Sequence, residues 1–260
     1  FESYTAAKAR IFANQSADDW AVVNADDPET LALARATRAR RVRFSVEGDP
    51  QAQIGVRDGA IVRTGDDGAP QPLVPVAAVR LPGRHLLADV LAAAAVASIA
   101  GVDPAAMTRA VETFTGLEHA LEPVSELNGV AFVNDSKATN IEAARRAIES
   151  FGRGVVVILG GRFKGGRFAD LRAPLAARGA TVIAIGEAQP LIHEALADAV
   201  PVQDASDMTE AVRAAFAAAA PGSTVVLAPA CASFDMFADY AERGRAFKQA
   251  VARLAREVEQ

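Results

Sequence analysis

The fold is decided by residues 129–140, which read GVAFVNDSKATN. Four apolar residues form a short strand, and the polar residues after it lead directly into a helical pattern over 141–148. Apolar strands followed by helical stretches recur at residues 155–160, 180–186 and 224–228. Such alternation is typical of a parallel sheet covered by helices on both faces. We therefore predict a doubly wound, Rossmann-like α/β domain with a mostly parallel sheet in the C-terminal half.

The preceding half has a mixed α and β pattern. Strands are expected at residues 20–24 and 42–46, and β-hairpins between 51 and 80, with tight turns at Asp58-Gly59 and at residues 65–68. Helices are expected over residues 1–15, 28–38, 86–100 and from 104 to about 114. We place the domain boundary near Thr115-Gly116. Residues 1–115 then form one domain and residues 116–260 the other.

Composition excludes several classes of partner. The formal charge is -5 and no block of Lys or Arg occurs, so neither nucleic acid nor an anionic membrane is expected as a partner. The most apolar stretch, residues 90–102, is too short to span a bilayer and is predicted to be a buried helix. The lone cysteine, Cys231, excludes an internal disulfide and fits a reducing compartment, so we expect a cytoplasmic protein.

Ligands of an open parallel sheet collect at the carboxyl ends of its strands. At the first such end, Asp135, Lys137 and Thr139 come just before a helix N-terminus, where an anionic group can dock. Alternatively, Thr139 or Asn140 merely caps that helix and Lys137 is solvated. The residues alone leave both readings open.

Two further strand ends carry candidate residues. Residues 160–166 read GGRFKGG, a loop whose glycines allow close backbone approach to a ligand and which carries Lys164. It lacks the spacing of a Walker phosphate loop, and a flexible turn with a solvated lysine is the alternative. Residues 228–235 read APACASFD, and Ser233 is predicted at a helix N-terminus, either as an anion contact or as a plain cap.

Three expectations concern the surroundings of Ser233. Phe234 and Phe237 are predicted to be core residues, and Cys231 a buried small residue rather than a nucleophile. Lys137 and Lys164 are expected to leave the ends of adjacent strands. They would then converge with Ser233 at one edge of the sheet.

Together these motifs resemble, in order, the C-terminal domain of the Mur ligases, a family of ATP-dependent ligases of bacterial cell-wall synthesis. The strand-end segments 134–140 and 229–235, with Arg243-Gly244 after them, point to the D-glutamate-adding branch of that family. The first half agrees with the family's central domain and hinge through YTAAKARIF at 4–12, VNADD at 23–27, LPGRH at 81–85 and FTGLEH at 114–119. The resemblance covers nearly the whole chain.

The resemblance implies a three-domain enzyme of peptidoglycan precursor synthesis. This chain would supply part of the central ATP-binding domain, without its phosphate loop, and the whole C-terminal domain, so we expect it to be inactive alone. ATP would phosphorylate the terminal carboxylate of UDP-N-acetylmuramoyl-L-alanine, and the amine of D-glutamate would attack the acyl phosphate. ATP and Mg²⁺ are the implied cofactors, and we expect a monomer.

The resemblance also assigns roles to residues. Lys8 corresponds to a carbamylated lysine that binds Mg²⁺, Asp135 to a contact of the ATP ribose, and His119 to a hinge residue near the nucleotide. The D-glutamate contacts correspond to Lys137, Thr139, Lys164, Ser233 and Tyr240. Lys8, His119 and Lys137 are the implied catalytic residues.

Three positions depart from the family pattern, all on the nucleotide side. Leu86 and Asp89 stand where the family has asparagines, the second of which touches adenine, and Ala120 stands where it has an arginine. An alternative function follows, in which the chain belongs to a degenerate paralogue, or is an amino-acid-binding fragment, without ATP chemistry.

Overall fold

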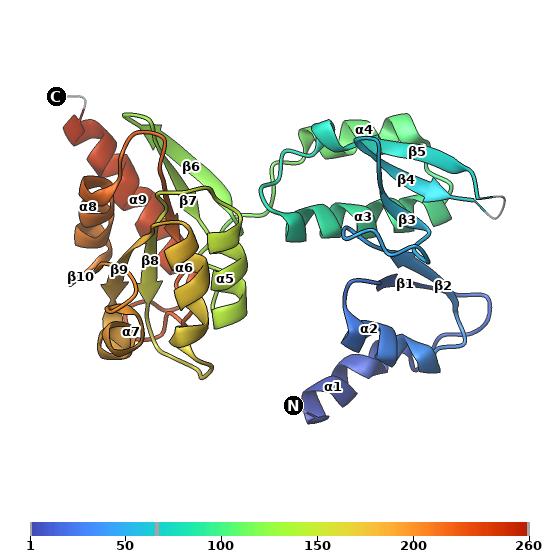
Figure 1. The fold of residues 1–260 in the computed structure, drawn as a ribbon, viewed down its shortest axis with the longest axis horizontal. Helices are drawn as coiled ribbons and strands as arrows, with labels where there is room; N and C mark the ends of the chain where they lie inside the picture. The colour runs from blue at the N-terminus through green and yellow to red at the C-terminus, as the bar shows by residue number, and fades with distance from the viewer. Residues whose placement is uncertain (1, 66–67, 259–260) are drawn as a thin grey trace. The chain divides into compact units, whose positions relative to one another are not determined.

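The computed structural model describes residues 2–65 and 68–258. It divides into two compact units, residues 1–115 and residues 116–260, which are drawn as ribbons in Figure 1. Each unit has its own sheet and its own hydrophobic core. They are described separately below.

The first unit has a five-stranded sheet in the order β1-β2-β3-β4-β5. Strands β1, β2 and β3 are parallel, and β3, β4 and β5 form an antiparallel meander. The strands are β1 Trp20–Asn24, β2 Arg40–Phe44, β3 Ile54–Arg57, β4 Ala60–Thr64 and β5 Pro70–Pro75. The helices are α1 Glu2–Ala9, α2 Pro28–Leu33, α3 Arg84–Ile99 and α4 Pro104–Thr113, with 3-10 turns η1 Arg10–Phe12, η2 Ala34–Ala36 and η3 Val76–Ala78.

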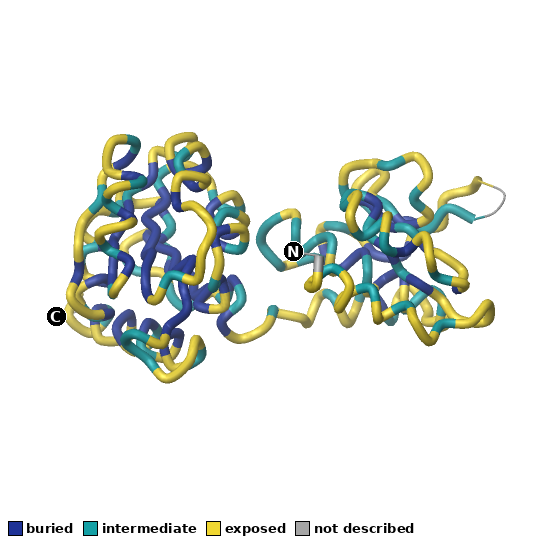
Figure 2. Tube along the Cα trace, turned by 90° about the horizontal axis from the view of Figure 1, so that it is seen from below, coloured by how far each residue is buried: buried dark blue, intermediate teal, exposed yellow. Residues whose placement is uncertain are grey.

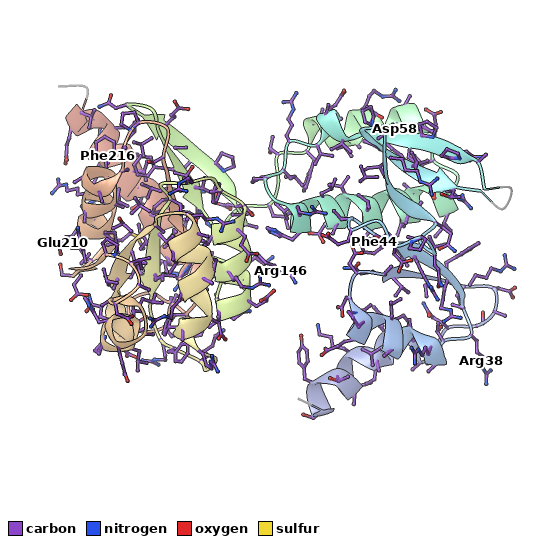
Figure 3. All side chains as sticks on the ribbon, in the orientation of Figure 1. Arg38, Phe44, Asp58, Arg146, Glu210 and Phe216 are labelled. Atoms are coloured by element: carbon purple, nitrogen blue, oxygen red, sulfur yellow. The ribbon has the colours of Figure 1, made fainter. Side chains whose placement is uncertain are left out.

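Helix α3 packs on this sheet through one face only. Its Val90, Leu91, Ala94 and Ala95 join strand residues such as Phe44, labelled in Figure 3, in the core. Val96 on the opposite face is 56% exposed, so the helix predicted to be buried is buried on one face only. In the described part of the chain, no helix combines the length and the apolar character needed to cross a membrane.

The mixed pattern predicted for this half is confirmed, with shorter helices at its start. The predicted helix over residues 1–15 ends as an α-helix at Ala9 and continues only as η1. Phe12 packs against a small core cluster, but Tyr4 is 64% and Ile11 74% exposed, so little burial supports a longer helix. The turn at Asp58-Gly59 joins β3 to β4 as expected. Of the second predicted turn, residues 66–67 lie outside the described residues.

The turn after β1 shows how two adjacent aspartates act differently. The Asp27 carboxylate accepts hydrogen bonds from the backbone N–H groups of Glu29 and Thr30 and so caps α2. The Asp26 carboxylate reaches across to the end of β2, where it accepts bonds from the Ser45 hydroxyl at 2.5 Å and the Val46 N–H at 2.7 Å. The Asn-Ala-Asp-Asp-Pro sequence therefore fixes both the helix start and the neighbouring strand end.

The second unit has a six-stranded sheet in the order β10-β9-β8-β11-β7-β6. All neighbours are parallel except β6, which pairs antiparallel with β7. The strands are β6 Glu122–Leu127, β7 Val130–Asn134, β8 Val156–Gly160, β9 Thr181–Ile185, β10 Val202–Ala205 and β11 Thr224–Leu227. The helices are α5 Ile141–Glu149, α6 Arg172–Ala177, α7 Gln189–Leu196, α8 Met208–Ala218 and α9 Tyr240–Val258, with 3-10 turns η4 Phe168–Leu171 and η5 Gly186–Ala188.

Helices cover both faces of this sheet, as the alternation of strands and helices predicts. One face buries Phe132, Ile158 and Ile183 against α8 and α9, with Phe216 of α8, labelled in Figure 3, 6.1 Å from Phe132 between ring centroids. The alternate residues, such as Val157 and Val182, are fully buried on the other face. Figure 2 shows the buried strands in dark blue through the middle of the unit. The predicted doubly wound fold with a mostly parallel sheet is confirmed.

The observed strand order differs from the expected one in the centre of the sheet, next to the loops that carry Lys137 and Lys164. Strands β7 and β8, which lead to Lys137 and Lys164, are not adjacent, because the last strand, β11, lies between them and pairs with both. Strands β6 and β10 were also not anticipated. Both are edge strands with partly exposed residues, so they lack the continuous apolar run that marks the central strands.

Candidate functional site

Three loops meet at the carboxyl edge of the second sheet. They are the β7 loop, residues 134–140, the β8 loop, residues 160–168, and the β11 loop, residues 228–237. The Ala230 N–H donates to the Ala138 carbonyl at 2.9 Å, which joins the β11 loop to the β7 loop. Arg162 and Ala232 exchange two backbone bonds of 2.9 and 3.0 Å, which join the β11 loop to the β8 loop.

The β8 loop depends on two glycines with positive φ. A Cβ at Gly160 would lie 1.9 Å from the Ile185 carbonyl oxygen, and one at Gly161 would lie 2.3 Å from the Ala232 carbonyl oxygen. Only glycine can occupy these positions without moving the backbone. The two glycines therefore allow a close approach between backbone segments of the protein, and the close approach to a ligand stays a prediction.

Lys164 and Thr139 come together from different loops. The Lys164 ammonium donates to the Thr139 hydroxyl at 3.4 Å, and Lys164 is exposed. The helix after the β7 loop is capped by Asn140, whose side chain accepts from the Ala143 N–H at 2.8 Å. Since Asn140 performs the capping, the hydroxyl of Thr139 and the exposed ammonium of Lys137 remain available to a ligand.

Ser233 is buried, at 2% exposed, but the prediction of its place at a helix N-terminus is wrong. Its carbonyl accepts bonds from the N–H groups of Met236 and Phe237, which forms one isolated turn. Helix α9 begins only at Tyr240, where the Asp239 carboxylate accepts from the Glu242 N–H. Asp239 and Tyr240 therefore mark the helix start, which the serine pattern had placed too early.

The phenylalanine predictions beside Ser233 have mixed outcomes. Phe234 is 62% exposed, so its assignment to the core is wrong, whereas Phe237 packs against the core. Cys231 is fully buried as predicted. Burial raises the pKa of its thiol to about 12, so it stays protonated and is a poor nucleophile.

Asp135 lies at the base of the β7 loop with 9% of its surface exposed. Its Oδ1 accepts a hydrogen bond of 3.2 Å from the Leu121 N–H. Burial raises the pKa of this carboxyl to about 6, against the lowering effect of the Leu121 bond and of Lys137. Asp135 is therefore ionised at neutral pH, and its second oxygen is able to accept a hydrogen bond from a ligand.

His119 is buried beside the β7 loop, at 4% exposed and with a φ of +66°. Asn134 Nδ2 lies 2.9 Å from His119 Nδ1 and donates to Glu122 Oε2 at 2.9 Å, while Asn134 Oδ1 accepts from the Ser136 N–H. Because that acceptor role fixes the amide orientation, Nδ2 faces the imidazole as a donor and Nδ1 accepts. The imidazole therefore carries its proton on Nε2.

Tyr240 opens α9 and is 41% exposed. Its ring meets the His119 ring edge to face, with 6.1 Å between the centroids. The candidate residues of the second unit thus lie along one edge, from the hinge side at His119 to the β8 loop at Lys164.

The structure also contains a residue that the motifs mentioned without a role. Arg243 is 1% exposed, and its guanidinium donates to the Ser136 hydroxyl, the Ser136 carbonyl and the Cys231 carbonyl. An arginine within a helical pattern is normally solvated. The sequence gives no signal of this burial beyond the place of Arg243 in the Arg243-Gly244 pair of the family resemblance.

Lys8 and Asp89 belong to the first unit and both are exposed, on α1 and α3. The Lys8 ammonium lies 5.4 Å from the centroid of the Tyr4 ring. Among the described residues, one group of His and acidic side chains is close enough to hold a metal ion, namely Glu118, His119 and Glu122. Lys248 already donates to both of its carboxylates, at 2.6 and 2.9 Å.

The second unit is thus a doubly wound domain with polar loops tied together at one edge of its sheet. Residues 1–97 match the family model described as Mur ligase middle domain, and residues 121–231 match Mur ligase, glutamate ligase domain. The two matches take in most of the chain, which belongs to the Mur ligase family.

Curated relatives share this assignment over nearly the full chain. A UDP-N-acetylmuramoylalanine–D-glutamate ligase from Solibacter usitatus is 46% identical over 251 residues, which are 96% of this chain and 56% of that protein. One from Symbiobacterium thermophilum is 43% identical over 262 residues, with 98% and 57% covered. The chain therefore spans a little over half the length of these relatives.

Solved structures confirm the fold at low sequence identity. A MurF ligase from Thermotoga maritima in complex with ADP superposes with a TM-score of 0.66 at 16% identity, over 98% of this chain and 58% of that chain. A pseudomurein peptide ligase type C from Methanothermus fervidus gives a TM-score of 0.71 at 13% identity, over 97% and 60%.

Proposed function

We propose that this chain supplies the central and C-terminal domains of an ATP-dependent ligase that joins D-glutamate to UDP-N-acetylmuramoyl-L-alanine. The family and the names of the relatives support the reaction. The observation that carries the amino-acid half of the proposal is the meeting of Lys164 and Thr139, 3.4 Å apart, on two loops that are both bonded to the loop of Ser233. We further propose that the enzyme acts as a monomer in the cytoplasm.

D-glutamate presents two carboxylates, and the edge of the second sheet offers matching groups. Lys164 and Lys137 are exposed cations on loops from two strands, and charge-assisted hydrogen bonds to a carboxylate are stronger than neutral ones. In our proposal they hold the carboxylates with the hydroxyls of Thr139, Ser233 and Tyr240. The bonds between the loops fix the backbone that carries Lys137, Thr139, Lys164 and Ser233 before the ligand arrives, which lowers the entropy cost of binding.

We assign three residues of the chain to the binding of ATP. The free oxygen of Asp135 is a suitable acceptor for a ribose hydroxyl, and His119 presents its Nε2 proton as a donor near the hinge. Asp89 on α3 stands where the family has the asparagine that touches adenine, and we assign the adenine contact to it. ATP activates the carboxylate of the first substrate as an acyl phosphate, which the amine of D-glutamate then attacks.

Lys8 fits Mg²⁺ only after a modification. An unmodified Lys8 is a cation and cannot be a metal ligand, whereas carbamylation would turn it into a carboxylate-like oxygen donor. When bound, Mg²⁺ would neutralise negative charge on the phosphates of ATP. We therefore propose that Lys8 is carbamylated in the active enzyme.

The test is made with the complete enzyme. Replacing the side-chain carboxylate of D-glutamate by an amide leaves a lysine with a poorer partner, so D-glutamine should be used roughly ten- to hundredfold less well. Lys164→Ala should raise the KM for D-glutamate by a similar factor and leave that for ATP nearly unchanged. Arg167→Ala is the matched control, because Arg167 is an exposed cation of the same loop paired with Asp170. Equal use of D-glutamine, or an unaltered KM in Lys164→Ala, would disprove the assigned pocket.

A further inference from the structure

We infer that Arg243 is a positioning residue that holds the β7 loop and the β11 loop in the arrangement needed to bind D-glutamate. The inference rests on the proposed function, because it assigns the residue a part in that binding site. The basis is a set of buried hydrogen bonds that one guanidinium makes to both loops.

The guanidinium bonds to the β7 loop at Ser136 and to the β11 loop at Cys231. Arg243 Nε donates to the Ser136 hydroxyl at 3.0 Å, and Nη2 donates to the Ser136 carbonyl at 2.9 Å and to the Cys231 carbonyl at 3.1 Å. The Ser136 hydroxyl in turn donates to the Tyr240 carbonyl at 2.6 Å. The β7 loop, the β11 loop and the first turn of α9 therefore share one hydrogen-bonded centre.

These bonds offset part of the cost of burying the guanidinium, whose Nη1 is buried without a hydrogen-bond partner; among the described residues, no carboxylate forms an ion pair with it. Burial lowers the pKa of Arg243 to about 10, and the group remains charged at neutral pH. A planar fork of donors can serve acceptors on two loops at once, which a single ammonium group cannot do with the same geometry. The geometry thus calls for arginine, whose role here is to join loops rather than to form an ion pair.

The candidate ligand contacts lie within one or two residues of these anchors. Lys137 follows Ser136 directly, and Ser233 comes two residues after Cys231. Loosening either anchor displaces those side chains, and a displacement of about 1 Å in a binding site is enough to lower activity by orders of magnitude. Arg243 does not need to touch the ligand for this effect.

The test replaces Arg243 by methionine, an unbranched apolar side chain of similar length. The variant removes the donor but not the buried acceptors on Ser136 and Cys231, so a moderate loss of stability is expected, and its folding is checked before exchange is measured. Hydrogen exchange is measured on the whole chain for the Ala230 and Ala232 amides, which bond across the loops, with the Val226 amide in strand β11 as the internal reference. Exchange at the two loop amides should rise at least about tenfold relative to Val226.

In the complete enzyme, Arg243→Met should raise the KM for D-glutamate by about tenfold or more and change the KM for ATP by less than about twofold. Arg243→Lys keeps the charge and one donor group, so its effects should be intermediate. Arg245→Met is the control, because Arg245 is an exposed arginine of the same helix, and it should behave as the wild type. If Arg243→Met does not fold, Arg243→Lys carries both measurements.

The outcomes separate the two proposals. Unchanged exchange at Ala230 and Ala232 would overturn the role of Arg243, whatever the kinetics show. Faster loop exchange with equal changes in both KM values would overturn the link to D-glutamate. A wild-type enzyme that does not use D-glutamate would overturn the proposed function, while the exchange result would still decide whether Arg243 holds the loops.

Discussion

Replacing Gly244 by alanine should destabilise the second unit, although the same change normally stabilises a helix. In the interior of α9 the substitution would gain about 1 kcal/mol of helix propensity. A Cβ at this position, however, would lie 2.3 Å from His119 Nδ1 and 3.0 Å from Asn134 Nδ2. Overpacking costs about 1 to 3 kcal/mol, and loss of the bond between Asn134 and His119 costs about 1 kcal/mol more. The net loss of unfolding free energy is therefore about 1 to 3 kcal/mol.

A double-mutant cycle provides the measurement. The only tryptophan, Trp20, lies in the first unit, so the unfolding free energy of the second unit is taken from hydrogen exchange of α9 amides under denaturant. In a His119→Ala background the obstructing ring is gone, and Gly244→Ala should be neutral or stabilising by up to about 1 kcal/mol. A Gly244→Ala variant as stable as the wild type, or equally destabilised in both backgrounds, would refute contact with His119 as the cause.

Three further predictions concern titration and the nucleotide side. Because the pKa of Asp135 is raised to about 6 in the folded state from 3.8, the folded state binds the proton of this carboxyl more tightly than the unfolded state does. The protonated carboxyl therefore contributes fully to stability below about pH 4, and this contribution is lost as the pH rises through 6. In urea titrations, the unfolding free energy of the wild type relative to that of Asp135→Asn should fall by up to roughly 3 kcal/mol between those pH values. A difference in unfolding free energy that does not change with pH would contradict the raised pKa. Lys8→Ala should abolish activity of the complete enzyme, and added short carboxylates should partly restore it; full activity without them would show Lys8 to be a surface residue only. Ala120→Arg should lower the KM for ATP in steady-state assays and leave that for D-glutamate nearly unchanged, whereas an unaltered KM for ATP would mean that another contact replaces the arginine.

The sequence predicts strands and loops of the second unit well because each central strand is buried on both faces. Residues 156–160 and 225–227 are all fully or almost fully buried, and such strands appear as unbroken apolar runs. The edge strands β6 and β10 contain residues such as Glu122 and Asp204 that face solvent or bond to side chains, so the same criterion misses them. Burial on both faces is thus what makes a strand visible in the sequence.

Side-chain pairs across the chain are harder to predict than the elements that carry them. Lys137 and Lys164 were expected to converge with Ser233 at one edge of the sheet, whereas the contact between Lys164 and Thr139 was not predicted. The role of Arg243 could not be predicted, because its three acceptors, two on Ser136 and one on Cys231, lie more than one hundred and about ten residues away in sequence. Helical periodicity places Arg243 on α9 but gives no information about which loops that side of the helix faces.

The strand order explains why the three loops can be joined at all. An apolar run looks the same whichever strands flank it, so the position of β11 between β7 and β8 leaves no mark on residues 224–227. With β7 and β8 adjacent, as expected from the sequence, the β11 loop would contact one of the other two loops at most. In the observed order it bonds to the β7 loop through Ala230 and to the β8 loop through Ala232, and Ser233 follows directly after this second bond. The central position of the last strand therefore brings together loops that lie about one hundred positions apart in the sequence.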